Sequence, residues 1–423
     1  MLTIKVEKSG GDYSVIQEAI DAVPYDESAV IEIGAGVYRE KIFCEKKEIT
    51  LVGAGMAETV IDYDDYANEV MPDGRKRGTF RTYTAFFGGK KVTVKDMSIR
   101  NSAGDGRVVG QAVAVYADAD VCRFENVKMT GCQDTLFCAP LPVAARQQNG
   151  FMGPRMMTER RLTKQYYKNC EIVGDVDFIF GGADAVFDDC VITCNDRMFG
   201  RSSTGVSGGT SGASAGSTTA AAGASGVSAG STTAAAGASG VSAGGGTAAS
   251  GTSGAGVDKD QIDVSERIIN GYITAACGLK DNLGFVFRNC TITGASGCEK
   301  GSVFLGRPWR EEARTVFLNC TMDDSIAPER FSGWGGITKD EPDTFYGEFG
   351  TKIAAGIGAE GSNTASEATA GDAEGANTGA EAGKPASLEH KNPWVRDIDE
   401  SLAAEISHRA DELVQGVTGD GSL

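Results

Sequence analysis

The sequence Gly174-Asp175-Val176-Asp177-Phe178-Ile179-Phe180-Gly181 places an ionisable side chain, Asp177, inside an apolar run. Valine, isoleucine and phenylalanine favour β-strands, and a glycine at each end delimits the run. A carboxylate in such a strand is costly unless it is paired or used in chemistry. Asp134 lies in a second segment of the same character, Gly131-Cys132-Gln133-Asp134-Thr135-Leu136-Phe137. We therefore predict that the fold brings Asp134 and Asp177 together in one active site.

A repeated pattern surrounds these two segments. It reads aromatic-x-Asn/Asp-Cys/Val-x-aliphatic, and its copies begin at Phe124, Tyr167, Phe187, Phe287 and Phe317. Such recurrence indicates a solenoid with rungs of roughly 20 to 30 residues. We expect strand alternation to put the aromatic, the cysteine and the aliphatic residue on different sides of a short kinked strand. Stacked rungs would align like residues into ladders, so for Asn126, Asn169, Asn289 and Asn319 we prefer a turn or ladder role to catalysis.

The pattern divides the chain into a body and several appendages. Residues 1–201 and 258–350 form the predicted catalytic solenoid, and a helix over 14–23 would cap its open end. Residues 202–257 contain a 14-residue Gly/Ala/Ser/Thr repeat and are predicted to be a flexible low-complexity insertion. Residues 351–390 are predicted to be a flexible tether. Residues 391–416 are predicted to be a C-terminal helical segment that either docks back or stands alone.

Composition excludes several classes of function. The 423 residues carry a formal net charge of −18, which argues against a nucleic-acid partner. An apolar run long enough to span a membrane is absent from the sequence. The N-terminus shows no signal-peptide pattern, so we expect a cytoplasmic protein, or an extracellular one if a leader was removed. The spacing of the 11 cysteines favours small buried side chains over a metal or redox site.

The two histidines, His390 and His408, both lie late in the chain. A Ser-His-Asp or Cys-His site in the body is therefore improbable on these residues. Hydrolytic chemistry would have to use carboxylates or a bound metal ion.

Four motifs in order give a specific resemblance. The chain contains Gln111-Ala112-Val113-Ala114-Val115, the segment around Asp134, the segment around Asp177, and Leu305-Gly306-Arg307-Pro308-Trp309. This ordered set resembles that of the pectin methylesterases. The resemblance covers about residues 1–200 and 258–350, and residues 140–155 look more like bacterial than plant members.

The resemblance implies a right-handed parallel β-helix that hydrolyses galacturonate methyl esters in pectin or in methylated oligogalacturonides. By resemblance, Asp177 would be the nucleophile and Asp134 the general acid and base. Gln111 and Gln133 would stabilise the oxyanion, and Arg307 would position Asp177. Trp309 and Phe178 would contact the substrate. The implied enzyme is a monomer that needs no metal or other cofactor.

Two other functions stay open at this point. A pectate-lyase-like enzyme could use the same solenoid, with Asp175, Asp177 and Asp184 as imaginable Ca²⁺ ligands. A non-catalytic solenoid could instead bind carbohydrate. The chain also departs from the family pattern. Cys132 stands where an aromatic residue is common, which puts substrate fit in doubt, and Asp184 adds an acid after the nucleophile motif.

Overall fold

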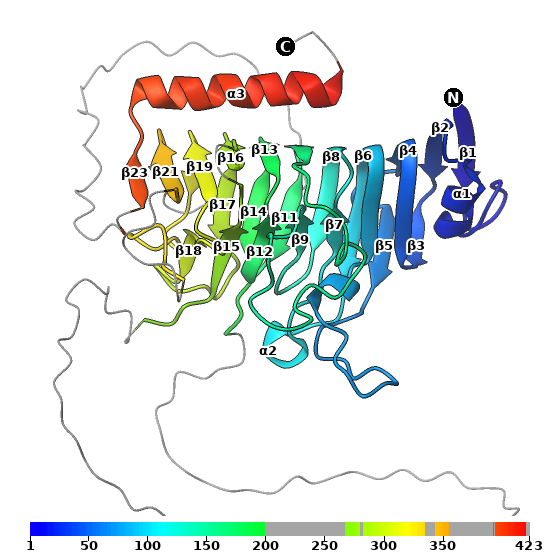
Figure 1. Cartoon of the computed structure of the whole chain (residues 1–423), viewed down its shortest axis with the longest axis horizontal. Helices are drawn as coiled ribbons and strands as arrows, with labels where there is room; N and C mark the ends of the chain where they lie inside the picture. Colours follow the sequence, from blue (N-terminus) through cyan, green and yellow to red (C-terminus); the bar gives the residue numbers. More distant parts are fainter. Residues whose placement is uncertain (199–266, 280–281, 335–342, 355–391, 393, 420–423) are drawn as a thin grey trace, which may run out of the picture. The chain divides into compact units, whose positions relative to one another are not determined.

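The computed structural model describes residues 1–198, 267–279, 282–334, 343–354, 392 and 394–419. In these residues the chain coils into a parallel β-helix, in which each strand pairs in parallel with the strand one turn later (Figure 1). The strands form three long parallel sheets, here called sheets I, II and III. The predicted β-helix is thus confirmed. The predicted insertion 202–257 and most of the tether lie outside the described residues.

Sheet I carries the segments that hold the two aspartates. It contains the first parts of β4 (Ile42–Val52) and β6 (Ala85–Asn101), then β7 (Val115–Ala117), β9 (Leu136–Cys138), β12 (Val176–Gly181), β15 (Gly271–Ala276) and β18 (Val303–Gly306).

Sheet II follows in each turn of the coil. It contains β1 (Leu2–Val6), β2 (Ser28–Ile33), parts of β4 and β6, the first part of β8 (Val121–Thr130), β10 (Lys164–Lys168), β13 (Asp184–Asp188), β16 (Phe285–Arg288), β19 (Arg314–Leu318), β21 (Phe345–Phe349) and β23 (Val395–Asp397).

Sheet III closes the turn. It contains β3 (Gly36–Arg39), β5 (Thr59–Tyr63), the ends of β6 and β8, β11 (Glu171–Gly174), β14 (Val191–Cys194), β17 (Thr291–Gly294), β20 (Thr321–Met322) and β22 (Lys352–Ile353).

The corner between sheets II and III explains the repeated asparagines. Asn126, Asn169, Asn289 and Asn319 all have φ between 51° and 54°, and Asp189 has φ 53°. This left-handed conformation is one that asparagine and aspartate tolerate better than most residues. The side chains also form a short ladder, because the Asn126 amide donates to Asp96 at 2.8 Å. The predicted turn role of these residues is confirmed.

The interior contains the predicted ladders. The rings of Phe124, Tyr167, Phe187, Phe287 and Phe317 stack in series, with neighbouring centroids 4.4–5.0 Å apart and nearly parallel planes. In the repeats that contain a cysteine, this residue lies three positions after the aromatic one and is a buried free thiol; these are Cys170, Cys190, Cys290 and Cys320. The expectation that the aromatic, the cysteine and the aliphatic residue lie on different sides was wrong. All three face the core, because the left-handed residue between the aromatic and the cysteine turns the chain.

Helices cover one end and one face of the coil. Helix α1 (Ile16–Ala22) contacts β1, β2 and β4 and buries Ile16, Ala19 and Ile20, so the predicted capping helix is present. The short α2 (Gly106–Val109) and a 3₁₀ turn (Thr79–Arg81) lie in the connections that precede sheet I. A helix long and apolar enough to cross a membrane does not occur among the described residues.

The C-terminal helix docks on sheet II. Helix α3 (Glu400–Thr418) packs Ile406, Leu413 and Val414 against side chains of β10, β13, β16 and β19 (Figure 1). Arg288 fixes the contact by pairing with both Asp188 and Asp411. Two predicted boundaries were wrong. Strand β22 lies inside the predicted tether and β23 inside the predicted helical segment, because short strands complete the last turns of the coil there.

Candidate active site

Asp177 stands at a break in its strand. Its φ is 52°, and the pairing of β12 with β15 shifts register between Val176 and Ile179. Asp134 has φ 66° and precedes β9 in the neighbouring turn. Its backbone N–H donates to the Val176 carbonyl at 3.1 Å, which ties the two segments together. A left-handed non-glycine residue costs about 1–3 kcal/mol, and such strain gathers at functional sites.

Arg307 holds the Asp177 carboxylate in a two-pronged ion pair. Its Nε and Nη2 each donate to a different carboxylate oxygen at 2.8 Å. The guanidinium lies between two aromatic rings, 3.9 Å from the Tyr272 centroid and 4.1 Å from the Trp334 centroid. Cation–π contacts and the planar fork together fix the direction of this group. The Asp177 carboxylate is therefore held in one orientation although it is only 7% exposed.

The two carboxyl groups have different environments. Burial and the Asp177 charge hold the pKa of Asp134 well above its ordinary value, and among the described residues no cation pairs with its carboxyl group. Burial also raises the pKa of Asp177, but the hydrogen bonds from Arg307 oppose that rise. Asp177 is thus the carboxyl that ionises first, and Asp134 is the one that retains a proton. This difference suits a nucleophile beside a general acid.

Gln133 directly precedes Asp134, and Gln111 lies in the preceding turn of the coil. The Ala112 N–H donates to the Gln133 carbonyl at 3.0 Å, which places the two glutamine segments side by side. The side-chain oxygen of Gln133 accepts from both terminal nitrogens of Arg197 at 3.4 Å. Because Arg197 occupies the oxygen, the amide N–H groups of Gln133 stay available as donors. Both glutamine side chains are partly exposed.

The two predicted substrate contacts lie in different environments. Trp309 is partly exposed and packs edge-on against Phe180 and Phe151, with centroids 5.9 and 6.4 Å apart. Phe178 is 0% exposed and belongs to the interior core, so its assignment as a substrate contact was wrong. The left-handed turn at Asp177 breaks strand alternation. As a result, the Phe178 ring points inward under Gly174.

The three acids considered as calcium ligands have separate protein partners. Asp175 pairs with Arg197 at 3.0 Å, and Asp177 pairs with Arg307. Asp184 lies on sheet II and accepts from the Gly284 N–H at 2.9 Å. The arrangement therefore does not present these three carboxylates to one ion.

A scan against family models matches the pectinesterase family over residues 3–147, 159–232 and 267–367. The chain belongs to the pectinesterase family. Probable pectinesterase/pectinesterase inhibitor 64 of Arabidopsis thaliana is 30% identical over 362 residues, covering 82% of this chain but 45% of the relative. Pectinesterase 31 of the same plant is 26% identical, and the match covers 81% of this chain and 80% of the relative. The chain thus spans about half the length of the first relative and most of the second.

Solved pectin methylesterases share the fold of this pectinesterase-family chain. The carrot enzyme matches with a TM-score of 0.61 and 21% identity, covering 100% of this chain and 98% of that chain. A pectin methylesterase in complex with a hexasaccharide matches with a TM-score of 0.58 and 19% identity, covering 96% and 95%. Matches to bacterial and plant proteins both occur, so the closer likeness to bacterial members stays a prediction.

Sequence reasoning missed three residues of this pectinesterase-family site. Arg197 contacts Gln133 and Asp175, whereas Tyr272 and Trp334 enclose Arg307. Tyr272 lies on β15, which pairs with β12, the strand that carries Asp177. Arg197 and Trp334 lie in connections between strands, where periodicity carries no signal.

Proposed function

We propose that this chain hydrolyses the methyl esters of galacturonate in pectin or in methylated oligogalacturonides and releases methanol. The supporting observation is the pair of buried carboxyl groups. Arg307 fixes one of them, and burial together with the Asp177 charge raises the pKa of the other, Asp134. Membership of the pectinesterase family agrees with this chemistry. A fold relative solved with a bound hexasaccharide supports an oligosaccharide as the ligand.

In the first half-reaction, the Asp177 carboxylate attacks the ester carbonyl carbon and forms a tetrahedral intermediate. The amide N–H groups of Gln133 and Gln111 donate to the oxyanion. Asp134 then gives its proton to the departing methoxide, and methanol leaves an acyl–enzyme anhydride on Asp177. A neutral amide suits the oxyanion role because it does not compete with Arg307 for the nucleophile.

In the second half-reaction, the ionised Asp134 takes a proton from a water molecule. The resulting hydroxide attacks the galacturonyl carbon of the anhydride and releases the free acid together with the Asp177 carboxylate. Asp134 regains its proton, so the enzyme returns to its starting state. Arg307 offsets the negative charge of the Asp177 carboxylate before the first half-reaction and again when the second half-reaction releases it.

The decisive experiment compares Asp177→Asn with Asp188→Asn. Asp188 is also buried and also forms a two-pronged pair with an arginine, Arg288, but it lies on sheet II. We expect methanol release to fall at least about 10³-fold in Asp177→Asn and to persist in Asp188→Asn. Release is measured on short methylated oligogalacturonides with and without EDTA.

Each alternative function gives a distinct result in the same assay. Unsaturated product that requires added Ca²⁺ would establish a lyase. Binding of the oligosaccharide with no turnover by folded wild-type protein would establish a carbohydrate-binding solenoid. Equal methanol release by the Asp177→Asn variant and the wild type would refute the assigned nucleophile.

A further inference from the structure

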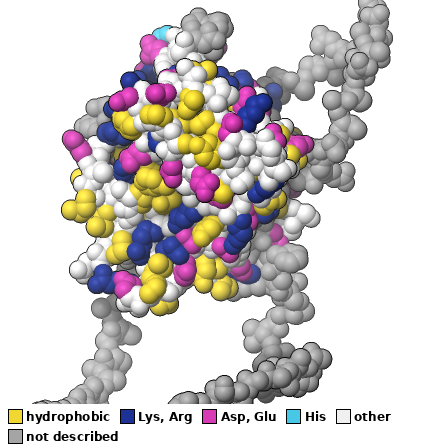
Figure 2. All heavy atoms as spheres, turned by 90° about the vertical axis from the view of Figure 1, so that its right-hand side faces the viewer, with side chains coloured by type: hydrophobic (Ala, Val, Ile, Leu, Met, Phe, Trp, Pro, Cys, Tyr) yellow, Lys and Arg dark blue, Asp and Glu magenta, His cyan; other side chains and the backbone are white. Residues whose placement is uncertain are grey.

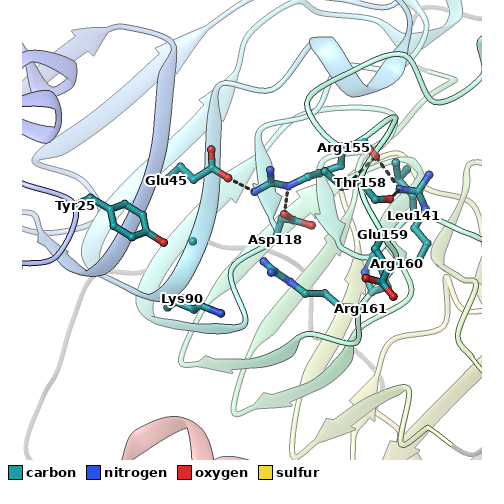
Figure 3. Close-up of a pocket in the computed structure, with 12 residues that line it drawn as sticks. Tyr25, Glu45, Lys90, Asp118, Leu141, Arg155, Thr158, Glu159, Arg160 and Arg161 are labelled. Atoms are coloured by element: carbon teal, nitrogen blue, oxygen red, sulfur yellow. Dashed lines mark hydrogen bonds and ion pairs between the residues drawn. The ribbon is translucent and has the colours of Figure 1, made fainter.

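A cavity lies beside the carboxyl ends of the first strands of sheet I. Its volume is about 450 Å³, within the ~300–1,000 Å³ typical of small-molecule sites. The catalytic aspartates stand before or at the start of β9 and β12, whereas the cavity residues Asp118 and Pro140 follow β7 and β9. The length of the strands therefore separates the cavity from the catalytic carboxylates. Figure 3 shows Tyr25 on one side of the cavity and Glu159 and Arg160 on the other.

One wall of the cavity carries an excess of positive charge. Lys90 and Arg161 both pair with a single carboxylate, Asp120, at 2.8 and 2.7 Å. Their side chains are 60% and 49% exposed, so they can turn toward a ligand. Figure 3 shows both side chains reaching the space beside Asp118. Figure 2 shows that Lys and Arg also group on the N-terminal end face of the molecule, so basic patches exist despite the net charge of −18.

The opposite wall carries an excess of acceptors. Arg155 is shared by Asp118 and Glu45, and it donates to Glu45 at 2.6 Å. One guanidinium cannot satisfy all the lone pairs of two carboxylates. The remaining oxygens are therefore free to accept hydrogen bonds from hydroxyl groups. Asp118 is 7% exposed, so this wall is built into the fold and is not a loose surface pair.

The rim of the cavity offers an aromatic face. Tyr25 is 52% exposed. Its backbone is anchored because its carbonyl accepts from the Lys47 N–H. Aromatic rings with one polar end are suited to the apolar face of a sugar. A cation pair, a row of hydroxyl acceptors and an aromatic ring thus surround one volume.

We infer that this cavity is a second carbohydrate site that binds the free carboxylate form of a galacturonate unit. Lys90 and Arg161 pair with the carboxylate, Asp118 and Glu45 accept from ring hydroxyls, and Tyr25 covers a face of the sugar. A bare anion such as phosphate would be repelled by the two acids, so the mixture of signs selects a sugar acid. The site would hold a de-esterified part of the polygalacturonate substrate, and in this respect the inference rests on the proposed function.

The test is a calorimetric titration of trigalacturonate, the fully de-esterified trimer, into the whole protein at low salt. The variant is Lys90→Ala/Arg161→Ala. The matched control is Lys95→Ala/Arg123→Ala, because Lys95 and Arg123 likewise share one carboxylate, Glu125, on sheet II. Both variants leave the active-site residues untouched, so any product binding there is the same in each.

We expect at least a tenfold weaker affinity in Lys90→Ala/Arg161→Ala and less than a twofold change in the control. In an Asp177→Asn background, which does not hydrolyse the esters, the fully methylated trimer, which lacks free carboxylates, should bind both variants alike. Equal trigalacturonate affinity in the two variants would overturn the inference.

Methanol release from the methylated trimer separates this inference from the proposed function. The Lys90→Ala/Arg161→Ala variant should retain wild-type release. Suppose that the wild type releases no methanol and that Lys90→Ala/Arg161→Ala still weakens trigalacturonate binding. The proposed activity would then fail, and the uronate site would stand.

Discussion

At the scale of single residues, the contact between Arg307 and Asp177 sets the acid limb of the pH profile. Removing a paired cation disfavours the ionised carboxylate, so the pKa of Asp177 must rise in Arg307→Gln. The charge of Arg307 also lowers the pKa of Asp134, but without a direct hydrogen bond. We therefore expect both limbs of kcat/KM against pH to move upward, the acid limb further. If kcat/KM were lower at every pH but its two limbs stayed at the same pH values, Arg307 would not act through Asp177.

The buried Asp134 carboxyl also predicts a stability effect. Its pKa in the folded state is raised, so the fold favours its neutral form. The free energy of unfolding falls as pH rises from the unfolded value, about 4, toward the raised folded value. Asn has no such ionisation, so Asp134→Asn should raise Tm at pH 7 while abolishing methanol release.

Thermal unfolding across pH 4 to 8 checks this prediction. The gap in Tm between Asp134→Asn and the wild type should widen with pH. A constant gap would mean that the amide stabilises the protein by packing alone, and a lower Tm for the variant would contradict the argument.

At the scale of elements, the left-handed asparagines are the points at which the strands turn. Asn289 has φ 54° between β16 and β17. Alanine tolerates this conformation poorly, at a cost of about 1–3 kcal/mol. We expect Asn289→Ala to lower the free energy of unfolding by about that amount, as measured by denaturant titration. Asn289→Gly, which accepts positive φ, is the control and should cost less, and equal losses would implicate the side-chain ladder instead of the backbone.

The same elements show what the sequence could and could not predict. The aromatic–Asn–Cys repeat predicts the coil because its spacing is periodic and its asparagines prefer the turn. Asp134, Asp177 and Arg307 come together as the motifs imply. Phe178 was misassigned, because a single left-handed residue reverses the side that the next side chain faces. The strands β22 and β23 are two and three residues long, too short for any periodicity to register.

At the scale of the whole molecule, the turns before and after residues 195–270 pair directly with each other. Strand β13 pairs with β16 and β14 pairs with β17, each in register across the intervening chain. The Met198 N–H also donates to the Asn270 side chain at 3.2 Å, so the two ends of that chain are close together. We therefore expect the packing of the coil not to depend on residues 202–257.

We accordingly expect that replacing residues 202–257 by a short Gly-Ser linker leaves Tm within about 2 °C of the wild type, since loop length changes stability only slowly. Scanning calorimetry of the shortened chain and the whole chain measures this. A large drop in Tm would show that the replaced residues contribute to the core. The same pair of proteins, assayed on short and long methylated substrates, would report whether the segment affects access to the active site.

The stack of rings inside the coil also bears on solubility. Its repeat, 4.4–5.0 Å, is close to the ~4.7–4.8 Å spacing at which identical strands add in amyloid fibrils. A coil of this kind is in effect a short length of fibre made from one chain, and an uncovered terminal turn is a template for the next molecule. Helix α1 lies against β1 and β2 and covers the first turn. By covering the apolar end of the coil, the same helix that completes the core also hinders a second molecule from stacking on that end.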